Sequence, residues 1–363
     1  MNDHWGLYVA RRSNTVLVLA VIVTIAAGCG SSVGGSPPAT DARTVRPSAT
    51  SSAGPVPSAS AVTTRSAVAD GEEWIVYQWD AGGDALFLVR PDGTGQHQVV
   101  PTMAGPERHP DWSPDGSKIA FIHNTPEDRS ELWVVDADGT NAKRIATCDL
   151  PCNEWNYPEW SADGRSIYVD TSADAANGPP STFGIDRFDV ASGARTTVLE
   201  RKDGMTAEQH RISPDGTLMA YTRGDIHDLD LGVAIYVATV KDGVDHRLTD
   251  PMLYGAHPDW TPDGRIVFNT RDLGAFQATS ESADLYVMDA DGGHLTQLTH
   301  RPSHDRLTQP RVTPDGSHVI YTHVAGEGFG TRTLWVIGTD GSGDRSLSEP
   351  PIIGTHPQWR PVA

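Results

Sequence analysis

Trp112-Ser113-Pro114-Asp115-Gly116 is the first of five copies of one short pattern in this chain of 363 residues. The copies begin at residues 112, 160, 212, 260 and 312, at intervals of 48, 52, 48 and 52 residues, and a truncated sixth copy starts at Trp359. Proline presets φ for the first position of a turn, aspartate accepts hydrogen bonds from nearby backbone amides, and glycine adopts positive φ. Each copy therefore predicts a tight turn between two strands.

The residues between the copies carry further strand signals. Ile119-Ala120-Phe121 follows the first turn, Leu132 to Val135 precedes a second turn at Asp136 to Gly139, and short segments such as Arg247-Leu248-Thr249 close the unit in other copies. Four strands in a period of about 50 residues are typical of one blade of a β-propeller.

The two ends of this repeat region complete each other. Glu73 to Tyr77 matches the second strand of a blade, and no first strand precedes it in the repeat. His356 to Trp359 has the sequence of a first strand without a second. We therefore predict an all-β, six-bladed propeller over residues 72–363, in which the N- and C-terminal strands share one blade and leave no open strand edge.

The repeated motifs resemble those of a known group of propellers. Trp-Ser-Pro-Asp-Gly, Ile-Ala-Phe and Leu-Tyr-Val-Met-Asp-Ala-Asp-Gly-Gly are similar to the repeats of TolB-like propellers, within the broader WD-type group, over about residues 72 to 361. Such repeats also occur in prolyl-oligopeptidase-type peptidases and oligogalacturonate lyases, so the resemblance implies a fold rather than one activity. Residues 72–363 have no Gly-x-Ser-x-Gly motif for a serine hydrolase, and the one match in the chain, Gly30 to Gly34, lies before the repeat region.

The first 71 residues have the pattern of an exported, anchored protein. Arg11 and Arg12 precede the apolar run Val16 to Ala27, which is too short to span a bilayer but suits a signal peptide. The small residues before Cys29 resemble a bacterial lipobox, which implies a signal peptide over residues 1–28 and a lipid, such as palmitate, on Cys29. A secreted form or a simple membrane anchor is the alternative. Residues 29–71 then form a flexible Ser-, Pro- and Ala-rich linker.

The amino-acid composition limits the classes of molecule that this protein could bind. The formal charge is −19 with four lysines, and no basic cluster follows the first few dozen residues, which argues against nucleic acid. We expect a protein anchored by lipid to the extracytoplasmic face of the cell membrane, with an envelope protein, a peptide or a saccharide as its partner.

One position in each first strand is the candidate binding site. It lies three residues before each copy of the pattern and should face the channel mouth, beside the irregular connections at 170–182, 223–232, 270–283 and 323–331. The six residues at this position are His109, Tyr157, Gln209, His257, Gln309 and His356. We predict that they contact a ligand.

A metal site is a second interpretation of the same position. His257, Gln309, His356 and His109 come from four consecutive blades, and neutral imidazole is a common ligand of divalent transition metals. The combination resembles the His and Gln site of oligogalacturonate lyases. A third interpretation is that the imidazoles only bind channel water or neighbouring carbonyl groups. No other cofactor is expected.

Three further groups of residues carry predictions. Cys148 and Cys152, four residues apart in an exported chain, favour a disulfide. The tryptophans at 112, 160, 260 and 359 occupy one repeated core position and predict packing between blades rather than a carbohydrate platform. Trp155 and Phe276 fall in irregular loops, where an aromatic ring either contacts a partner or packs within the loop. The arginines near the same rim are surface residues or contacts for an anionic ligand: Arg108, Arg223, Arg271 and Arg332.

These residues are compatible with two functions. The first is a non-catalytic, membrane-anchored module that binds or scaffolds a partner at the channel mouth. The second is a metal-dependent lyase or hydrolase that acts on anionic saccharides.

Overall fold

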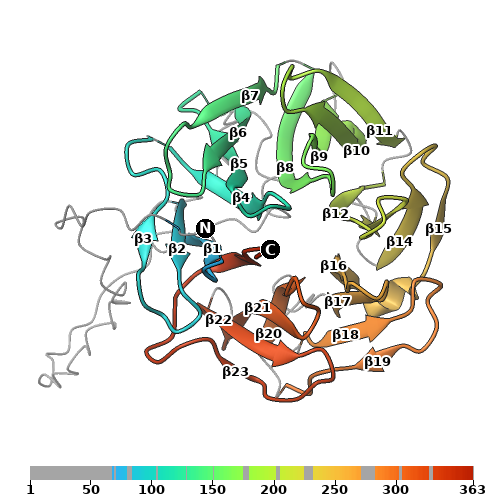
Figure 1. Cartoon of the computed structure of the whole chain (residues 1–363). Helices are drawn as coiled ribbons and strands as arrows, with labels where there is room; N and C mark the ends of the chain where they lie inside the picture. Colours follow the sequence, from blue (N-terminus) through green and yellow to red (C-terminus); the bar gives the residue numbers. More distant parts are fainter. Residues whose placement is uncertain are drawn as a thin grey trace, which may run out of the picture. The chain divides into compact units, whose positions relative to one another are not determined.

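The computed structural model describes residues 68, 71–79, 84–103, 105–127, 129–149, 151–174, 180–201, 205–224, 232–270, 283–301, 305–326 and 330–362. Six four-stranded antiparallel sheets surround a central axis, which confirms the predicted six-bladed β-propeller (Figure 1). Cys29, the rest of the signal and lipobox segment, Phe276 and Arg271 lie outside the described residues.

The blades follow one another in chain order around the axis. Blade 1 contains β24 (Thr355–Trp359), β1 (Ile75–Trp79), β2 (Ala85–Val89) and β3 (His97–Gln98). Blade 2 contains β4 (Glu107–Trp112), β5 (Lys118–Asn124), β6 (Ser130–Asp136) and β7 (Lys143–Thr147). Blade 3 contains β8 (Cys152–Trp160), β9 (Ser166–Asp174), β10 (Pro180–Asp189) and β11 (Arg195–Arg201).

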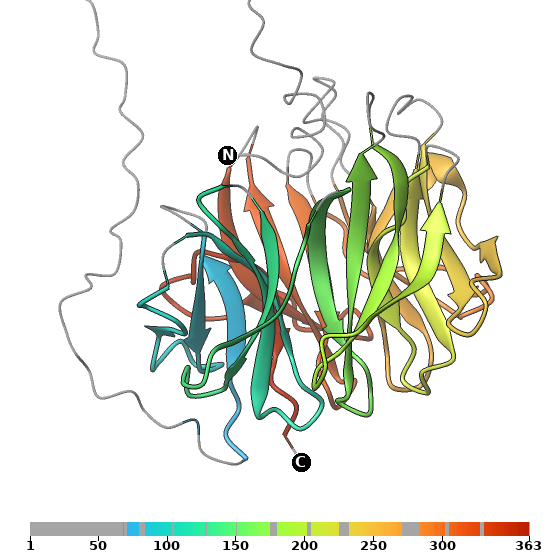
Figure 2. The same ribbon diagram turned by 90° about the horizontal axis from the view of Figure 1, so that it is seen from above.

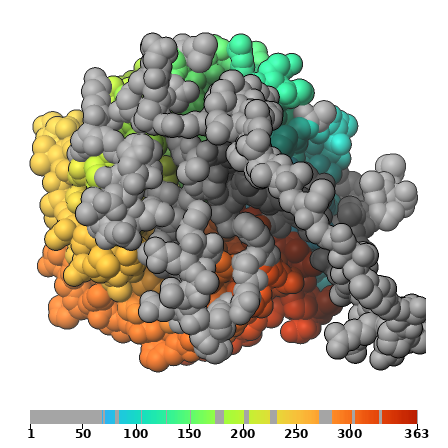
Figure 3. Space-filling model, turned by 180° about the vertical axis from the view of Figure 1, so that it is seen from behind, coloured from blue at the N-terminus to red at the C-terminus, as the bar shows by residue number. Residues whose placement is uncertain are grey.

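The second half of the ring repeats this arrangement. Blade 4 contains β12 (Glu208–Ile212), β13 (Leu218–Gly224), β14 (Val233–Thr239) and β15 (Asp245–Arg247). Blade 5 contains β16 (Gly255–Trp260), β17 (Ile266–Thr270), β18 (Leu285–Met288) and β19 (Thr296–Gln297), and a 3₁₀ turn, η2 (Pro251–Leu253), precedes it. Blade 6 contains β20 (Arg306–Val312), β21 (His318–Ala325), β22 (Thr331–Gly338) and β23 (Arg345–Ser346). The coloured sectors of the space-filling view follow the same order (Figure 3).

Blade 1 closes the ring as predicted. The C-terminal strand β24 pairs antiparallel with β1, with Ile75 opposite Trp359. Beyond this strand, Arg360 N–H donates to the carbonyl of Trp74 at 2.8 Å. The Arg360 side chain donates to the carbonyls of Gly116, at 2.9 Å, and Glu72, at 3.0 Å. The closing strand is therefore bonded to blade 1 and to the turn of blade 2.

The hydrophobic core lies between neighbouring blades. One cluster combines Trp74 and Leu88 of blade 1 with Trp112 and Phe121 of blade 2. Trp112, Trp160 and Trp260 are all buried at the same repeat position, which confirms their predicted packing role. Burying such a side chain contributes at least about 1.5–3 kcal/mol, so the repeated tryptophan holds blades 2, 3 and 5 against the blade before each of them. Trp359 is only partly buried, against the cluster between blades 6 and 1.

The Ser-Pro-Asp-Gly turns have the predicted hydrogen bonds. In the first copy the Ser113 hydroxyl donates to Asp115 at 2.6 Å, Gly116 N–H donates to the Ser113 carbonyl at 2.8 Å, and Gly116 has φ of 64°. The corresponding bonds hold Thr313 and Asp315 in the last full copy. The hydroxyl of Thr313, followed by that of Ser317, lowers the pKa of Asp315 to about 2.

Two expectations about irregular loops are wrong. The predicted connection 170–182 is largely strand, because β9 and β10 continue to pair, with Gly184 opposite Thr171 and Thr182 opposite Ala173. Trp155 lies in β8, is 1% exposed and packs edge-on against Phe188 with ring centroids 4.9 Å apart. The nine residues of β8 extend past the usual length of a first strand, so this tryptophan packs in the core instead of contacting a partner.

The strands run roughly from one face of the disc to the other (Figure 2). The C-terminal end lies at the face of the Ser-Pro-Asp-Gly turns, since Arg360 contacts Gly116. No helix in the described part of the chain is long and apolar enough to cross a bilayer.

Candidate functional site

The six predicted channel residues share an unusual backbone. All adopt positive φ, between 48° and 58°, although none is glycine: His109, Tyr157, Gln209, His257, Gln309 and His356. Such a conformation costs of the order of 1–3 kcal/mol at each residue, and strained residues of this kind cluster at functional sites. We call these six residues the mouth ring.

The strain comes from a β-bulge in each first strand. In blade 2, Arg108 pairs with Ile122 and Asp111 with Ala120, so that His109 and Pro110 together face one residue of β5. Proline lacks the N–H that a regular ladder would use, and a bulge tolerates it. Five of the six mouth-ring residues precede proline, and Gln209, which precedes His210, is the exception. The bulges recur at this position in every blade.

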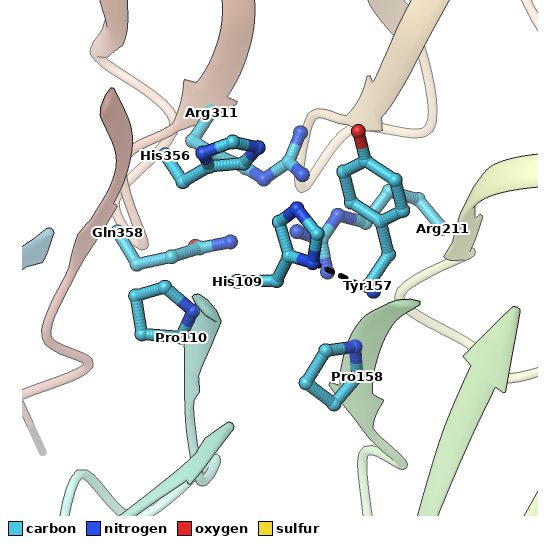
Figure 4. A pocket seen from close by; sticks show the side chains of 8 residues that line it. All are labelled: His109, Pro110, Tyr157, Pro158, Arg211, Arg311, His356 and Gln358. Atoms are coloured by element: carbon cyan, nitrogen blue, oxygen red, sulfur yellow. Dashed lines mark hydrogen bonds between the residues drawn. The ribbon is translucent and has the colours of Figure 1, made fainter. Parts of the chain in front are cut away.

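Four mouth-ring residues bring their rings together across the channel. His109 stacks on Tyr157 with centroids 4.3 Å apart and meets His356 edge-on at 4.5 Å (Figure 4). Tyr157 also lies 5.8 Å from His356 and 6.1 Å from His257. We call His109, Tyr157 and His356 the rim cluster. Burial, followed by the charges of Glu208 and Asp170, raises the pKa of Tyr157, so its phenol stays protonated.

The two glutamines of the mouth ring connect neighbouring blades. The side-chain oxygen of Gln209 accepts from His257 N–H at 3.0 Å and from the Thr222 hydroxyl at 2.8 Å. Gln309 repeats the arrangement with His356 N–H, at 3.0 Å, and with Thr322. Both glutamines thus hold neighbouring blades together by hydrogen bonds. Their predicted role in ligand binding stays a prediction.

The predicted metal ligands also have hydrogen-bond partners. Nε2 of Gln309 lies 2.9 Å from Nε2 of His356, and Nδ1 of His257 lies 3.1 Å from Oδ1 of Asn269. No group of three or more His, Cys, Asp or Glu side chains within the described residues has an arrangement suited to a metal ion. A metal at His109, His257, Gln309 and His356 therefore stays a prediction.

A second ring of polar residues lies one layer deeper, and the sequence reasoning missed it. It consists of the residue two positions after each mouth-ring residue: Asp111, Glu159, Arg211, Asp259, Arg311 and Gln358. We call these residues the floor ring. The signal was present in the sequence, because each of them directly precedes the Trp, Ile or Val that opens a copy of the turn pattern.

Arg211 is at the centre of the charges in the floor ring. Its guanidinium lies 3.5 Å from Asp111, 3.7 Å from Asp259 and 4.0 Å from Glu159. Burial raises the pKa of Asp111, and burial, opposed by the nearby Arg211 and His210, raises that of Glu159 to about 7. Each of the three carboxylates also accepts a backbone N–H group of the next blade, so these charges link blades 2 to 6.

The two rings enclose a small pocket on the channel axis. Its lining residues are His109, Pro110, Tyr157, Pro158, Arg211, Arg311, His356 and Gln358 (Figure 4). It holds about 200 Å³ of empty space, including open solvent. Because this volume includes open solvent, the enclosed part of the pocket has room for about one water molecule and not for a stretch of polymer.

The structure joins Cys148 and Cys152 by a disulfide, with their Cα atoms 5.4 Å apart. Both cysteines are buried, in one cluster with Trp155. The loop that they close lies between β7 and β8, at the boundary of blades 2 and 3.

Two of the four predicted rim arginines, Arg108 and Arg223, form contacts away from the pocket. Arg108 forms an ion pair with Asp84 at 2.8 Å. Arg223 lies 3.5 Å from Asp245 and stacks over the ring of Tyr236. The arginines that line the pocket are Arg211 and Arg311, which the sequence reasoning did not select.

Fold and channel define the chain as a closed six-bladed β-propeller. The propeller is TolB-like in fold: TolB from Acinetobacter baumannii matches with a TM-score of 0.57 and 22% identity, over 80% of this chain and 67% of that one. A putative TolB from Agrobacterium tumefaciens matches with a TM-score of 0.56 and 18% identity, over 78% of this chain and 90% of that one. At such identities the likeness shows the fold alone.

Curated sequences give partial matches. The uncharacterized peptidase YuxL of Bacillus subtilis is 26% identical over 191 residues, which are 52% of this chain and 26% of that protein. Tricorn protease homolog 1 of Streptomyces coelicolor is 28% identical over 286 residues, 73% of this chain and 23% of that protein. The chain thus spans about a quarter of the length of these two relatives. No family model matches it.

Proposed function

We propose that this protein is a non-catalytic binding or scaffolding module, held at the extracytoplasmic face of the cell membrane by a lipid on Cys29. The partner, an envelope protein, would dock at the channel mouth. The observation that carries this proposal is the rim cluster, in which His109, Tyr157 and His356 crowd together on strained backbone.

The chemistry of the rim cluster favours a protein partner. Imidazole and phenol rings combine an apolar ring with a hydrogen-bonding group, a combination that is enriched at protein interfaces. His109 and Tyr157 are 3% and 7% exposed and His356 is half-buried, so a partner would reach the edges of these rings from the channel mouth. The pocket below is too small for several sugar residues of a saccharide. A protruding loop of a protein that packs against the rim fits these features.

The binding role is tested by changing the rim. Tyr157→Ala and His356→Ala would each reduce the amount of partner recovered with the detergent-solubilised full-length protein by at least about tenfold, as expected for the centre of an interface. His294→Ala is the matched control, since His294 is an exposed histidine that pairs with Asp289 on a turn of blade 5. Equal recovery of the same partner with all three variants would overturn the proposed site.

The anchor is tested separately. Cells supplied with an alkyne-bearing fatty acid would label the full-length protein, and Cys29→Ser would abolish both the label and the recovery of the protein in the membrane fraction. A label that persists in Cys29→Ser, or a wild-type protein that is never labelled, would contradict lipid attachment at Cys29.

The enzyme alternative has a test of its own. A metal-dependent lyase would retain about one equivalent of manganese or zinc after dialysis, and His257→Ala would lose both this metal and any turnover of uronate polymers. Substoichiometric metal in the wild type together with retained partner binding would leave the scaffold as the function.

A further inference from the structure

Arg311 is a buried cation whose hydrogen-bonding capacity is mostly unused. The residue is 6% exposed and lines the axial pocket. Its guanidinium carries five N–H groups. Within the described residues it donates one hydrogen bond, from Nη1 to the carbonyl of Pro310 at 2.8 Å, and no carboxylate lies within 4.0 Å of it.

The carboxylates of the floor ring are occupied by other groups. Asp259 accepts Val312 N–H at 2.7 Å, Asp111 accepts Trp160 N–H at 2.9 Å, and Glu159 accepts Ile212 N–H at 2.9 Å. The same three carboxylates lie nearest to Arg211. These backbone N–H groups thus hold the three carboxylates near Arg211. Arg311 is left without an ion pair.

The unpaired arginine stays charged at neutral pH. Burial, together with the positive charge of nearby Arg211, lowers the pKa of Arg311 to about 10. Asp259, Asp111 and Glu159 stabilise this charge at longer range, and an incoming anion would add a direct, hydrogen-bonded partner. In Figure 4 the Arg311 guanidinium lies between the rings of His356 and Tyr157.

We propose that the floor of the channel is a carboxylate-binding site, in which the guanidinium of Arg311 receives the side chain of an aspartate or glutamate that a partner loop inserts past His109, Tyr157 and His356. This inference rests on the proposed function and adds the chemistry of the group that is recognised. A planar guanidinium and a carboxylate form two parallel N–H···O bonds, a geometry that favours carboxylate over a spherical anion.

Size and charge set the strength of this site. The empty space at the pocket includes open solvent, and the rings of the rim cluster are in contact above it, so a carboxyl group would have to displace water and move these rings apart to reach Arg311. Asp111, Glu159 and Asp259 repel an anion, and two arginines attract it. We therefore expect an isolated carboxylate to bind weakly, with a dissociation constant of about 1 mM or above, and a complete partner loop to gain the rest of its affinity at the rim.

The test uses the side-chain Nε–H resonance of Arg311 in the isotope-labelled full-length protein, assigned by its disappearance in Arg311→Lys. Capped aspartate, N-acetyl-Asp-N-methylamide, should shift this resonance saturably below about 50 mM, whereas capped asparagine and chloride at equal ionic strength should not. The absence of a shift, or an equal shift with chloride, would overturn the carboxylate site.

Variants of Arg311 test whether this residue binds the carboxylate. By equilibrium dialysis of labelled capped aspartate, Arg311→Gln should weaken binding at least about tenfold, and Arg311→Lys, which keeps a charge without the fork geometry, should have an intermediate effect. Arg265→Gln is the control, because Arg265 is an exposed arginine that pairs with Asp263 on a turn. Thermal unfolding establishes that each variant is folded. Wild-type affinity in folded Arg311→Gln would refute the assignment.

A free small acid and a peptide side chain are distinguished by comparing acetate with capped aspartate. Tighter binding of capped aspartate supports a peptide-borne carboxylate, and equal or tighter binding of acetate overturns the inserted side chain. Loss of partner in Tyr157→Ala but not in Arg311→Gln would leave the proposed function standing and remove this inference.

Discussion

The backbone N–H of His356 donates to the side-chain oxygen of Gln309 at 3.0 Å, across the boundary between blade 6 and blade 1. The Thr322 hydroxyl donates to the same oxygen at 3.0 Å. One amide side chain thus connects the last internal blade to the strand that closes the ring.

Replacing Gln309 should weaken this connection. Gln309→Ala leaves a buried N–H and a buried hydroxyl without their acceptor, so we expect the free energy of unfolding in urea to fall by about 1–3 kcal/mol. Gln98→Ala is the control, because Gln98 in the outer strand β3 makes no side-chain hydrogen bond within the described residues, and a change within about 0.5 kcal/mol is expected. Equal losses in the two variants would contradict the bracing role.

Arg360 should matter more than its position near the chain end suggests. Arg360→Ala removes hydrogen bonds to the carbonyls of Gly116 and Glu72 and the contact with the Trp112 ring. We expect a loss of about 2–3 kcal/mol in urea unfolding. Arg345→Ala, which removes bonds only to nearby carbonyls in its own blade, should change stability by less than about 1 kcal/mol.

Stability should fall as the pH rises from about 5 to 8. Glu107 is 1% exposed, and burial, reinforced by the charge of Asp84 and opposed by the Leu86 amide, raises its pKa to about 8. Between the ordinary glutamate pKa and this value the folded state binds more protons than the unfolded state, so raising the pH favours unfolding. Glu159, with a pKa of about 7, contributes in the same direction.

Glu107→Gln tests this pH dependence. The variant should be more stable than the wild type at pH 8 and should lose much of the slope between pH 5 and 8, as measured by urea unfolding at several pH values. Glu127→Gln, at an exposed position, should keep the wild-type slope. A wild-type stability that rises steadily from pH 5 to 8 would refute the assignment.

The disulfide should have a modest effect because its loop is short. Closing so few residues contributes about 2 kcal/mol by the chain-entropy model, so the double variant Cys148→Ala, Cys152→Ala should unfold at lower urea by about that amount. Alkylation of the denatured, unreduced domain should find both residues blocked. Full alkylation of both cysteines before reduction would show that the bond is absent.

The blade pattern was predictable because it depends on local chemistry. The turn at Ser113 to Gly116 and the buried tryptophans are set by residues close in sequence, and their period gives the number of blades. The closure between β24 and β1 follows by elimination, since the first and last segments each lack a complementary strand.

The chemistry of the channel was only partly predictable. The positions of His109, Tyr157 and His356 followed from the repeat, but their positive φ depends on bulges that the sequence pattern does not specify. The floor ring was missed because charged residues next to a tryptophan usually lie at a surface. That Arg211 has ion pairs and Arg311 has none depends on ångström-scale distances among several blades, which no local pattern encodes.

The pairing of Ile75 with Trp359 joins residues that are 284 positions apart. Until the last strand is available, β1 has an unpaired edge that another copy of the chain could occupy. Blades 2 to 6 can form as they emerge, whereas blade 1 must wait for the last strand, so mispairing at β1 is the step at which overproduction of this protein would lead to aggregation.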